Sequence, residues 1–351
     1  MKTMRILSIG GFSGLGDSNT CILRDNVLQS FGSVDHVDTT RQPYNLYYRI
    51  CNRLFRMGLN IGLPDLAGAN EEIVRFVRNK EIKYDIVWID KGIIVRENTF
   101  KEIRRCQPQA KIIGYSPDWM VGRHNQSRQF LESLPFYDCY VTTKSYAVDD
   151  MKQLGCRDVY YIGNAFQRDF HRPYNLTADE QKRFHCDVSF IGAFERERVE
   201  SIMFLAEHGI KVDIWGSQLW REFCDSHPNL AFRGTELMNE DYCKALSGSR
   251  ISLCFLRKVN KDLQTTRSVE IPACGSFMLA ERTTEHQAMF REDEEAVFFS
   301  NNEELLEKCQ YYLEHEELRR RIAQAGHERC MASDYSYEGR IRMILEHVLN
   351  G

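Results

Sequence analysis

The chain has 351 residues, of which 43% are hydrophobic and 27% charged, and its 46 basic against 50 acidic side chains give a net charge of -4. Because single cores rarely grow beyond roughly 250 to 300 residues, this length predicts two domains of about 150 residues each. The slightly acidic balance argues against a nucleic-acid partner held by charge, so any phosphate site must be local.

Twelve cysteines are spread from Cys21 to Cys330 without a C-x-x-C pair. We interpret them as reduced thiols rather than as a disulfide framework or a zinc site. The opening "MKTMRILSIGG" has too short an apolar run for a signal peptide. No stretch approaches the roughly 20 apolar residues that span a bilayer. These features predict a cytoplasmic protein.

The first half alternates short apolar runs with amphipathic stretches, which is typical of strand-helix units around a parallel sheet. The expected strands are 5–11, 34–39, 85–90, 111–116, 139–143 and 158–164. The pattern predicts a Rossmann-like α/β domain over residues 1–165.

The second half repeats this architecture after a polar stretch, 166–187, that we interpret as a linker. Its expected strands are 188–193, 211–216, 230–234, 251–256 and 276–280. They predict a second Rossmann-like domain over 188–335, and the last helix, 336–351, is expected to cross back to the first domain. Parallel sheets bind ligands at the carboxyl ends of their strands, so we expect a ligand cleft between the domains.

A glycine-rich loop, "GGFSGLGDSNT", follows the first expected strand. A dinucleotide-binding loop would need a third glycine where Asn19 stands, which disfavours an NAD-dependent oxidoreductase. We favour a wall that faces donor phosphates, where Gly11 and Gly14 allow close backbone approach. A simple turn between strand and helix explains the loop equally well.

The segment "YNLYYRICNRLFRMGLN" predicts an amphipathic helix. One helical face carries Arg49, Arg53 and Arg56, beside an apolar face of Tyr47, Ile50, Leu54 and Met57. This pattern fits peripheral contact with an anionic membrane or a phosphorylated acceptor. We favour the alternative, a packed domain helix with a solvated rim.

The segment "KDLQTTRSVEIPACGSFMLAE" follows the expected strand 251–256 and can open a helix near Thr265. Its free N–H groups, the hydroxyls of Thr265 and Thr266 and the guanidinium of Arg267 would form an anion site. Glu270, one turn later, could accept hydrogen bonds from a ribose diol, and Asp262 could do so from sugar hydroxyls. A capped core helix with surface carboxylates remains an equal alternative.

Other basic and glycine residues lie near expected strand ends. Arg196 and Arg198 follow "VSFIGA", where a planar guanidinium can bind phosphate oxygens in pairs. Lys258 and Lys261 belong to the loop before Thr265. Gly234 ends another expected strand and permits close approach of a base.

Several stretches resemble known glycosyltransferases. Asp262 and Glu270 are separated by seven residues, and "LQTTRSVEIPACGSFMLA" resembles the donor segment of retaining GT-B enzymes, where two acidic residues flank the nucleotide-sugar. Asp262 stands where those enzymes usually have Glu. Six stretches resemble one branch, the spore-maturation-protein (CgeB-like) glycosyltransferases: "YDIVWIDKG", "GYSPDWM", "HNQSRQFLESLPFYDCYVTTKS", "FIGAFERER", "FLRKVNKDLQTTRSVEIPACGSFMLAERTTEH" and "ELLEKCQYYLEHEELRRRIAQAG". The middle four are the most specific.

This resemblance implies a GT-B fold, in which two Rossmann-like α/β domains face a central cleft. It implies transfer from a nucleotide-diphosphate sugar without metal or other cofactor, and it inclines us to retention. Donor binding would involve Glu270, Arg267, Arg198 and their neighbours. The acceptor, whether glycan, lipid-linked or protein, stays open. Two alternatives remain: a sugar-nucleotide epimerase or hydrolase of the same fold, and a non-catalytic nucleotide-sugar-binding protein.

Two candidate catalytic residues follow the expected strand 111–116. Asp118 and His124 lie in "GYSPDWMVGRHN", at a carboxyl strand end. An inverting transferase would need one of them as general base, whereas a retaining one would use them to position the acceptor. Asp262 is the third candidate. A turn-capping role is the alternative for Asp118.

Overall fold

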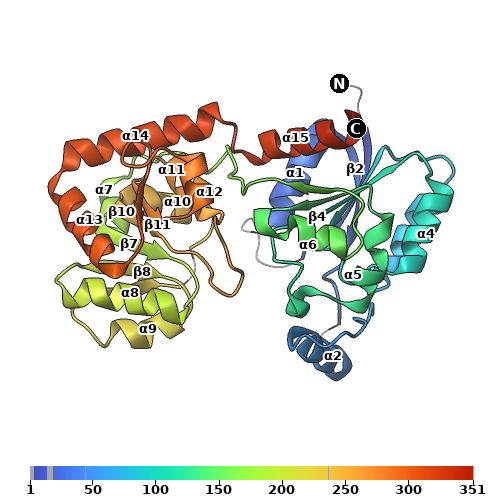
Figure 1. Ribbon diagram of the computed structural model, residues 1–351, viewed down its shortest axis with the longest axis horizontal. Helices are drawn as coiled ribbons and strands as arrows, with labels where there is room; N and C mark the ends of the chain where they lie inside the picture. Colours follow the sequence, from blue (N-terminus) through green and yellow to red (C-terminus); the bar gives the residue numbers. More distant parts are fainter. Residues whose placement is uncertain (1–3, 14–18, 44, 236, 351) are drawn as a thin grey trace. The chain divides into compact units, whose positions relative to one another are not determined.

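The computed structural model describes residues 4–13, 19–43, 45–235 and 237–350. The chain forms two compact α/β units (Figure 1). The first unit comprises Met1–Gly163 and Tyr337–Gly351, and the second comprises Asn164–Ser336.

The sheet of the first unit is parallel, with strand order β2-β1-β3-β4-β5-β6. Its strands are β1 (Met4–Gly10), β2 (Gly32–Asp38), β3 (Ile86–Asp90), β4 (Lys111–Ser116), β5 (Cys139–Thr142) and β6 (Val159–Tyr161). Every residue of the central β3, "IVWID", is buried, as expected for a parallel strand covered on both faces.

The helices of the first unit are α1 (Thr20–Phe31), α2 (Leu46–Arg56), α3 (Ala69–Arg78), α4 (Glu97–Cys106), α5 (Arg128–Ser133), α6 (Val148–Gln153) and α15 (Tyr337–Asn350), with short 3-10 turns η2 (Arg123–Asn125), η3 (Leu134–Phe136) and η4 (Ser145–Ala147). Most of these helices lie against the sheet of this unit, whereas α2 lies apart from it (Figure 1). The C-terminal α15 packs beside α1, so the chain's last helix belongs to the first unit.

The sheet of the second unit is also parallel, with order β12-β11-β10-β7-β8-β9. Its strands are β7 (Cys186–Ile191), β8 (Val212–Trp215), β9 (Leu230–Gly234), β10 (Ser249–Cys254), β11 (Met278–Glu281) and β12 (Val297–Phe299). Alternate β10 residues enter two cores, with Ile251 and Leu253 in one and Cys254 in the other, because successive strand side chains point to opposite faces.

The first helix of the second unit precedes its first strand. The helices of this unit are α7 (Ala178–Phe184), α8 (Arg196–Glu207), α9 (Leu219–Cys224), α10 (Asn239–Gly248), α11 (Arg267–Ala273), α12 (Thr284–Met289), α13 (Asn302–Glu314) and α14 (Glu316–Ala332). The helix α11 is short and contains Pro272, as the sequence predicts, because an interior proline cannot extend a helix.

Two segments differ from the sequence-based expectations. Residues 166–187, interpreted as a linker, lie in the second unit and include α7, whose Thr177 and Glu180 form a capping box. The strand β12 had no counterpart among the expected strands, since its three residues are too few to show a period.

Candidate functional site

The strand order of the second sheet reverses between β7 and β10, whose carboxyl ends lie side by side. Open parallel sheets bind ligands at such a point. Gly192 follows β7, and α11 follows the loop after β10. A Cβ added at Gly192 would lie 2.7 Å from Nη2 of Arg267. The glycine therefore leaves room for the guanidinium of Arg267 at the strand ends.

Two arginines converge on the ring of Phe190, the fifth residue of β7. The guanidinium carbon of Arg198 lies 5.6 Å from the ring centroid, and that of Arg267 lies 5.8 Å from it. Arg198 is only 2% exposed. Of its polar atoms, Nη1 donates to the carbonyl of Ala193 at 2.9 Å, while Nη2 lies 3.6 Å from a carboxylate oxygen of Glu195.

These two guanidinium groups have hydrogen-bonding capacity left over. Nε and Nη2 of Arg198 and Nε of Arg267 are buried, and none has a hydrogen-bond partner among the residues that the structure describes. Burial, and then the charge of Arg267, lowers the pKa of Arg198 to about 10. Buried donors without partners cost stability unless a ligand satisfies them. The pair is therefore arranged to bind an anion such as a diphosphate.

Glu270 lies on α11 one turn after Arg267 and is 9% exposed. One carboxylate oxygen accepts a 2.8 Å hydrogen bond from the hydroxyl of Tyr242 on α10. The other lies 3.8 Å from Nε2 of His171. Because Nδ1 of His171 accepts from the backbone N–H of Gln167, Nε2 carries the hydrogen of the neutral ring and faces Glu270. These two neighbours hold the carboxylate in one orientation.

A buried chain of hydrogen bonds fixes the residues before α11. The ring of His286 donates from Nδ1 to the carbonyl of Glu281 at 2.7 Å, so its Nε2 accepts from the hydroxyl of Ser268 at 2.7 Å. The same hydroxyl oxygen accepts from the backbone N–H of Thr265 at 3.0 Å. This chain positions the turn that leads to Arg267 and Glu270.

The two buried histidines predict a pH dependence of stability. Burial lowers the pKa of both His171 and His286, whereas unfolded histidine titrates near pH 6.5. Below about pH 6.5 the unfolded chain binds protons that the folded chain excludes, so the free energy of unfolding falls, by up to about 1.4 kcal/mol per pH unit for each histidine.

We expect urea unfolding between about pH 7.5 and 5.5 to show this loss, with a shallower slope in His286→Gln. His208→Gln, which changes an exposed histidine, should keep the wild-type slope. Equal slopes in all three proteins would contradict the assignment.

The loop between β10 and α11 holds Asp262 in a buried position, where its backbone N–H donates to the carbonyl of Arg257. Lys261, just before it, has a positive φ of 51° and is exposed. Lys258 forms an ion pair with Glu281, and this pairing offsets its charge.

The remaining predicted donor residues are spread along the same unit. Arg196 is exposed and pairs with Glu200 on α8, on a different side of the helix from Arg198. Thr266 is the N-cap residue of α11 but makes no side-chain cap hydrogen bond. Gly234 ends β9 with a φ of 145°, and its carbonyl accepts from Gly216 after β8. The structure thus brings Arg198, Arg267 and Glu270 to the β7 and β10 ends and leaves Arg196 outside.

The predicted catalytic residues Asp118 and His124 belong to the first unit. Asp118 follows β4, and one of its carboxylate oxygens forms an ion pair with Nζ of Lys91, which follows β3. His124 lies in η2 against the ring of Trp119. Lys91 competes with any substrate proton for this oxygen of Asp118. The sequence did not reveal Lys91 as the ion-pair partner of Asp118.

Asp38 organises the described part of the glycine-rich loop. Its carboxylate accepts from the backbone N–H of Phe12 and from the hydroxyls of Ser13 and Thr40, and these hydrogen bonds lower its pKa against the opposing effect of burial. A Cβ on Gly11 would meet Thr40 at 2.9 Å. Gly14 lies outside the described residues.

Residues 196–346 match the family model described as glycosyl transferase-like, and no curated protein sequence matches the chain. Among solved structures, the Anabaena protein HepE in complex with UDP-glucose is similar with a TM-score of 0.66 and 11% identity, covering 99% of this chain and 100% of that one. Sucrose-phosphate synthase from Thermosynechococcus elongatus is similar with a TM-score of 0.61 and 12% identity, covering 98% of each chain.

The chain has the GT-B fold. A putative UDP-N-acetylglucosamine 2-epimerase from Listeria monocytogenes is also similar, with a TM-score of 0.59 and 12% identity over 99% of this chain and 98% of that one. At such low identity these structures share the GT-B architecture with the chain, and activity must be argued from the residues.

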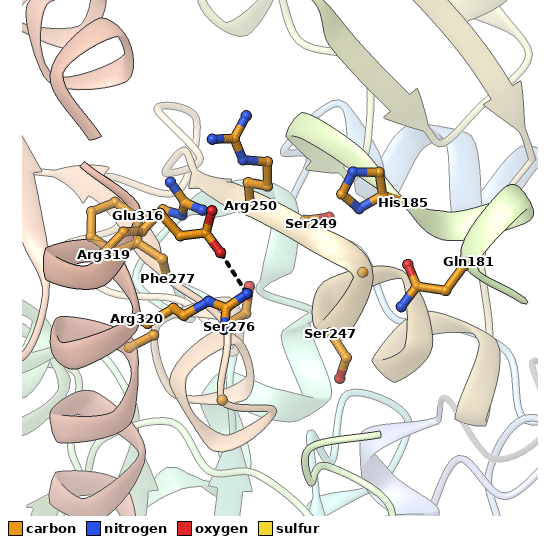
Figure 2. Close-up of a pocket in the computed structure, with 13 residues that line it drawn as sticks. Gln181, His185, Ser247, Ser249, Arg250, Ser276, Phe277, Glu316, Arg319 and Arg320 are labelled. Atoms are coloured by element: carbon orange, nitrogen blue, oxygen red, sulfur yellow. Dashed lines mark ion pairs between the residues drawn. The ribbon is translucent and has the colours of Figure 1, made fainter. Parts of the chain in front are cut away.

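A cavity of about 550 Å³ lies at the amino ends of the strands of the second GT-B sheet, where β7 and β10 begin (Figure 2). The arginines that line this cavity already form ion pairs or hydrogen bonds within the protein. Arg250 pairs with Asp187, Arg320 pairs with Glu316, and Arg319 donates to the carbonyl of Tyr312. Parallel sheets bind ligands at the carboxyl ends of their strands, where Arg198 and Arg267 lie.

One group of candidate metal ligands occurs among the described residues. It joins Cys139 of β5, Asp158 before β6 and His347 of α15, with ligand atoms within 4.8 Å of one another. Sequence spacing could not reveal it, because the three residues are far apart along the chain. The group lies at the amino edge of the first sheet, away from Asp118. His347 and Asp158 already bond to each other at 2.7 Å.

Sequence reasoning missed Gly192, Tyr242, His171 and His286. Gly192 lies in the quoted stretch "VSFIGA", and a glycine at the end of an apolar run was the available signal. The other three lie in segments without a motif, and only the fold brings them to α11.

Proposed function

We propose that the chain transfers a sugar from a nucleotide-diphosphate sugar to an acceptor hydroxyl. The observation that carries this proposal is the pair of guanidinium groups of Arg198 and Arg267, which have buried donors without partners at the switch point of a parallel sheet. The glycosyl transferase-like match over 196–346 includes both residues. UDP is the first nucleotide to test, because HepE binds UDP-glucose.

The proposed roles follow from the positions of the side chains. Arg198 and Arg267 bind the diphosphate and stabilise its charge as the bond between sugar C1 and the phosphate oxygen breaks. Glu270, held by Tyr242 and His171, accepts hydrogen bonds from the ribose diol. Asp262, buried in the loop before α11, binds sugar hydroxyls.

We further propose a retaining, metal-independent reaction. In it the acceptor oxygen bonds to C1 on the face that the phosphate leaves, and the acceptor proton passes to the departing phosphate oxygen. The two guanidinium groups supply the positive charge that a divalent cation would otherwise provide. Retention is proposed because the segment with Asp262 and Glu270 resembles the donor segment of retaining GT-B enzymes. In this scheme Asp118 and His124 position the acceptor rather than acting as nucleophiles.

We propose that the chain belongs to the spore-maturation-protein (CgeB-like) branch, on the four most specific of the quoted stretches, with a hexose as the expected sugar. A reducing compartment such as the cytoplasm fits its twelve cysteines, all of which are free.

The first test is thermal unfolding with UDP, other nucleoside diphosphates, UDP-glucose and NAD. At about 100 times its dissociation constant a ligand stabilises by roughly 2.7 kcal/mol, so we expect one nucleoside diphosphate to raise Tm clearly. Arg267→Gln should lose the shift, and Arg320→Gln, at the other edge of the sheet, should keep it. A shift with NAD alone would refute the proposal.

A product assay separates the transferase from the two alternatives. A transferase releases nucleoside diphosphate faster when acceptors are added. Equal release with water alone would identify a hydrolase, conversion of the nucleotide-sugar without release an epimerase, and tight binding without turnover under any acceptor a binding protein.

A further inference from the structure

The helix α2 of the first unit exposes apolar side chains. Leu46 is 69% exposed, Ile50 50% and Met57, its C-cap residue, 69%. Tyr47 and Leu59 beside them are 60% and 46% exposed. Of the thirteen large hydrophobic side chains that are exposed in the described residues, six lie between Leu46 and Leu66. The apolar face was expected to pack against the domain, and that interpretation is wrong, because Tyr47, Ile50 and Met57 are exposed.

The sides of α2 differ in character. Leu46, Ile50 and Met57 follow one another at helical spacing, so they share one outer face. Phe55, half a turn away from that face, is buried and attaches the helix to the rest of the unit. A surface helix normally turns its apolar stripe toward the core. In α2 a second apolar stripe points away from the protein.

Positive charge flanks this outer stripe. Arg49, Arg53 and Arg56 lie on the adjacent face and are exposed, and residues 39–64 contain no Asp or Glu. Gly58, just after α2, lies against Arg123 of η2, where an added Cβ would be 3.2 Å from the Cβ of Arg123. Residues 119–131, which include η2, add arginines and likewise contain no acidic residue. The whole patch is apolar and basic.

We propose that α2 docks the chain onto an anionic lipid bilayer. A helix with an exposed apolar stripe and arginines along one flank lies in the plane of the interface, with the stripe among the acyl chains and the guanidinium groups at the lipid phosphates. At eleven residues α2 is too short to span a bilayer. Among the described residues, no helix is long and apolar enough to cross one. The proposed attachment is therefore peripheral.

The position of α2 places this surface near the residues proposed to position the acceptor. The helix follows the carboxyl end of β2 and contacts η2, which follows the carboxyl end of β4. Asp118, the candidate acceptor-positioning residue, lies in the same β4–η2 connection. If the proposed function holds, this edge binds the acceptor, and docking would favour an acceptor anchored in the membrane. The docking itself does not depend on that function.

Co-sedimentation with vesicles tests the docking without any nucleotide. We expect the wild type to bind vesicles of phosphatidylcholine and phosphatidylglycerol in equal amounts, and not vesicles of phosphatidylcholine alone. Arg53→Gln/Arg56→Gln should weaken binding about 30-fold, since each basic residue near an anionic surface contributes about fivefold. Ile50→Gln/Met57→Gln should weaken it about tenfold or more, because the stripe loses apolar area.

The matched control variants carry the same kinds of substitution at exposed positions outside α2. Arg75→Gln/Arg78→Gln removes two exposed arginines of α3, and Leu219→Gln removes an exposed apolar side chain of the second unit. Both should bind as the wild type does. The nucleotide-induced Tm shift of every variant reports folding, and its retention separates a failure of docking from a failure of the proposed function.

Several outcomes would overturn the proposal. These are no binding to anionic vesicles, equal loss in the control variants, or binding that both α2 variants keep. A wild-type dimer that Ile50→Gln/Met57→Gln dissociates, without vesicle binding, would show instead that α2 pairs with a second copy of the chain.

Discussion

Arg198→Met is expected to stabilise the ligand-free protein by about 2 kcal/mol and to weaken binding of UDP, the nucleotide proposed for this site, roughly a hundredfold. The reason for both effects is the same buried charge. Arg198 is 2% exposed, and its Nε and Nη2 have no hydrogen-bond partner in the described part of the chain. Methionine fills a similar volume without that desolvation cost, but it cannot bind phosphate oxygens.

Urea unfolding without ligand and UDP titration by calorimetry measure the two effects. Arg319→Met is the matched control, because Arg319 is also buried but lies at the other edge of the sheet and donates to the carbonyl of Tyr312. Its UDP affinity should equal that of the wild type. If Arg198→Met bound UDP as well as the wild type, Arg198 would be a structural residue and the anion site would be misplaced.

Glu270→Gln is expected to weaken binding of UDP by about 2 kcal/mol, or roughly thirtyfold, with little change in Tm. Glutamine can still accept the hydrogen bond from Tyr242, so the buried hydroxyl keeps a partner. It loses the negative charge that strengthens hydrogen bonds from a diol. Glu270→Ala would additionally leave the Tyr242 hydroxyl without its partner and lower Tm.

A comparison of two ligands, with and without the ribose 2′-hydroxyl, tests the role of Glu270 more directly. The wild type should prefer UDP over 2′-deoxy-UDP by about tenfold or more, and Glu270→Gln should lose most of that preference. Glu303→Gln, an exposed change on α13, should retain it. An undiminished preference in Glu270→Gln would mean that the carboxylate does not contact the ribose.

Local sequence patterns were enough to predict most of the strands and both sheets. The eleven expected strands occur in the structure, because short apolar runs between amphipathic stretches are a local signal of parallel strand-helix units. The sequence also located the loop that follows β10 and the short α11 with Pro272.

The sequence by itself determined the α/β class, the order in which strands and helices follow one another along the chain, and the residue types available at each strand end. Only the tertiary structure decided which of those residues meet. Arg198 is buried against Phe190 while Arg196, two positions away, is exposed, because successive helix positions face different directions. Likewise, Tyr242 and His171 reach Glu270, and the stripe on α2 stays uncovered, because such contacts depend on how distant segments pack.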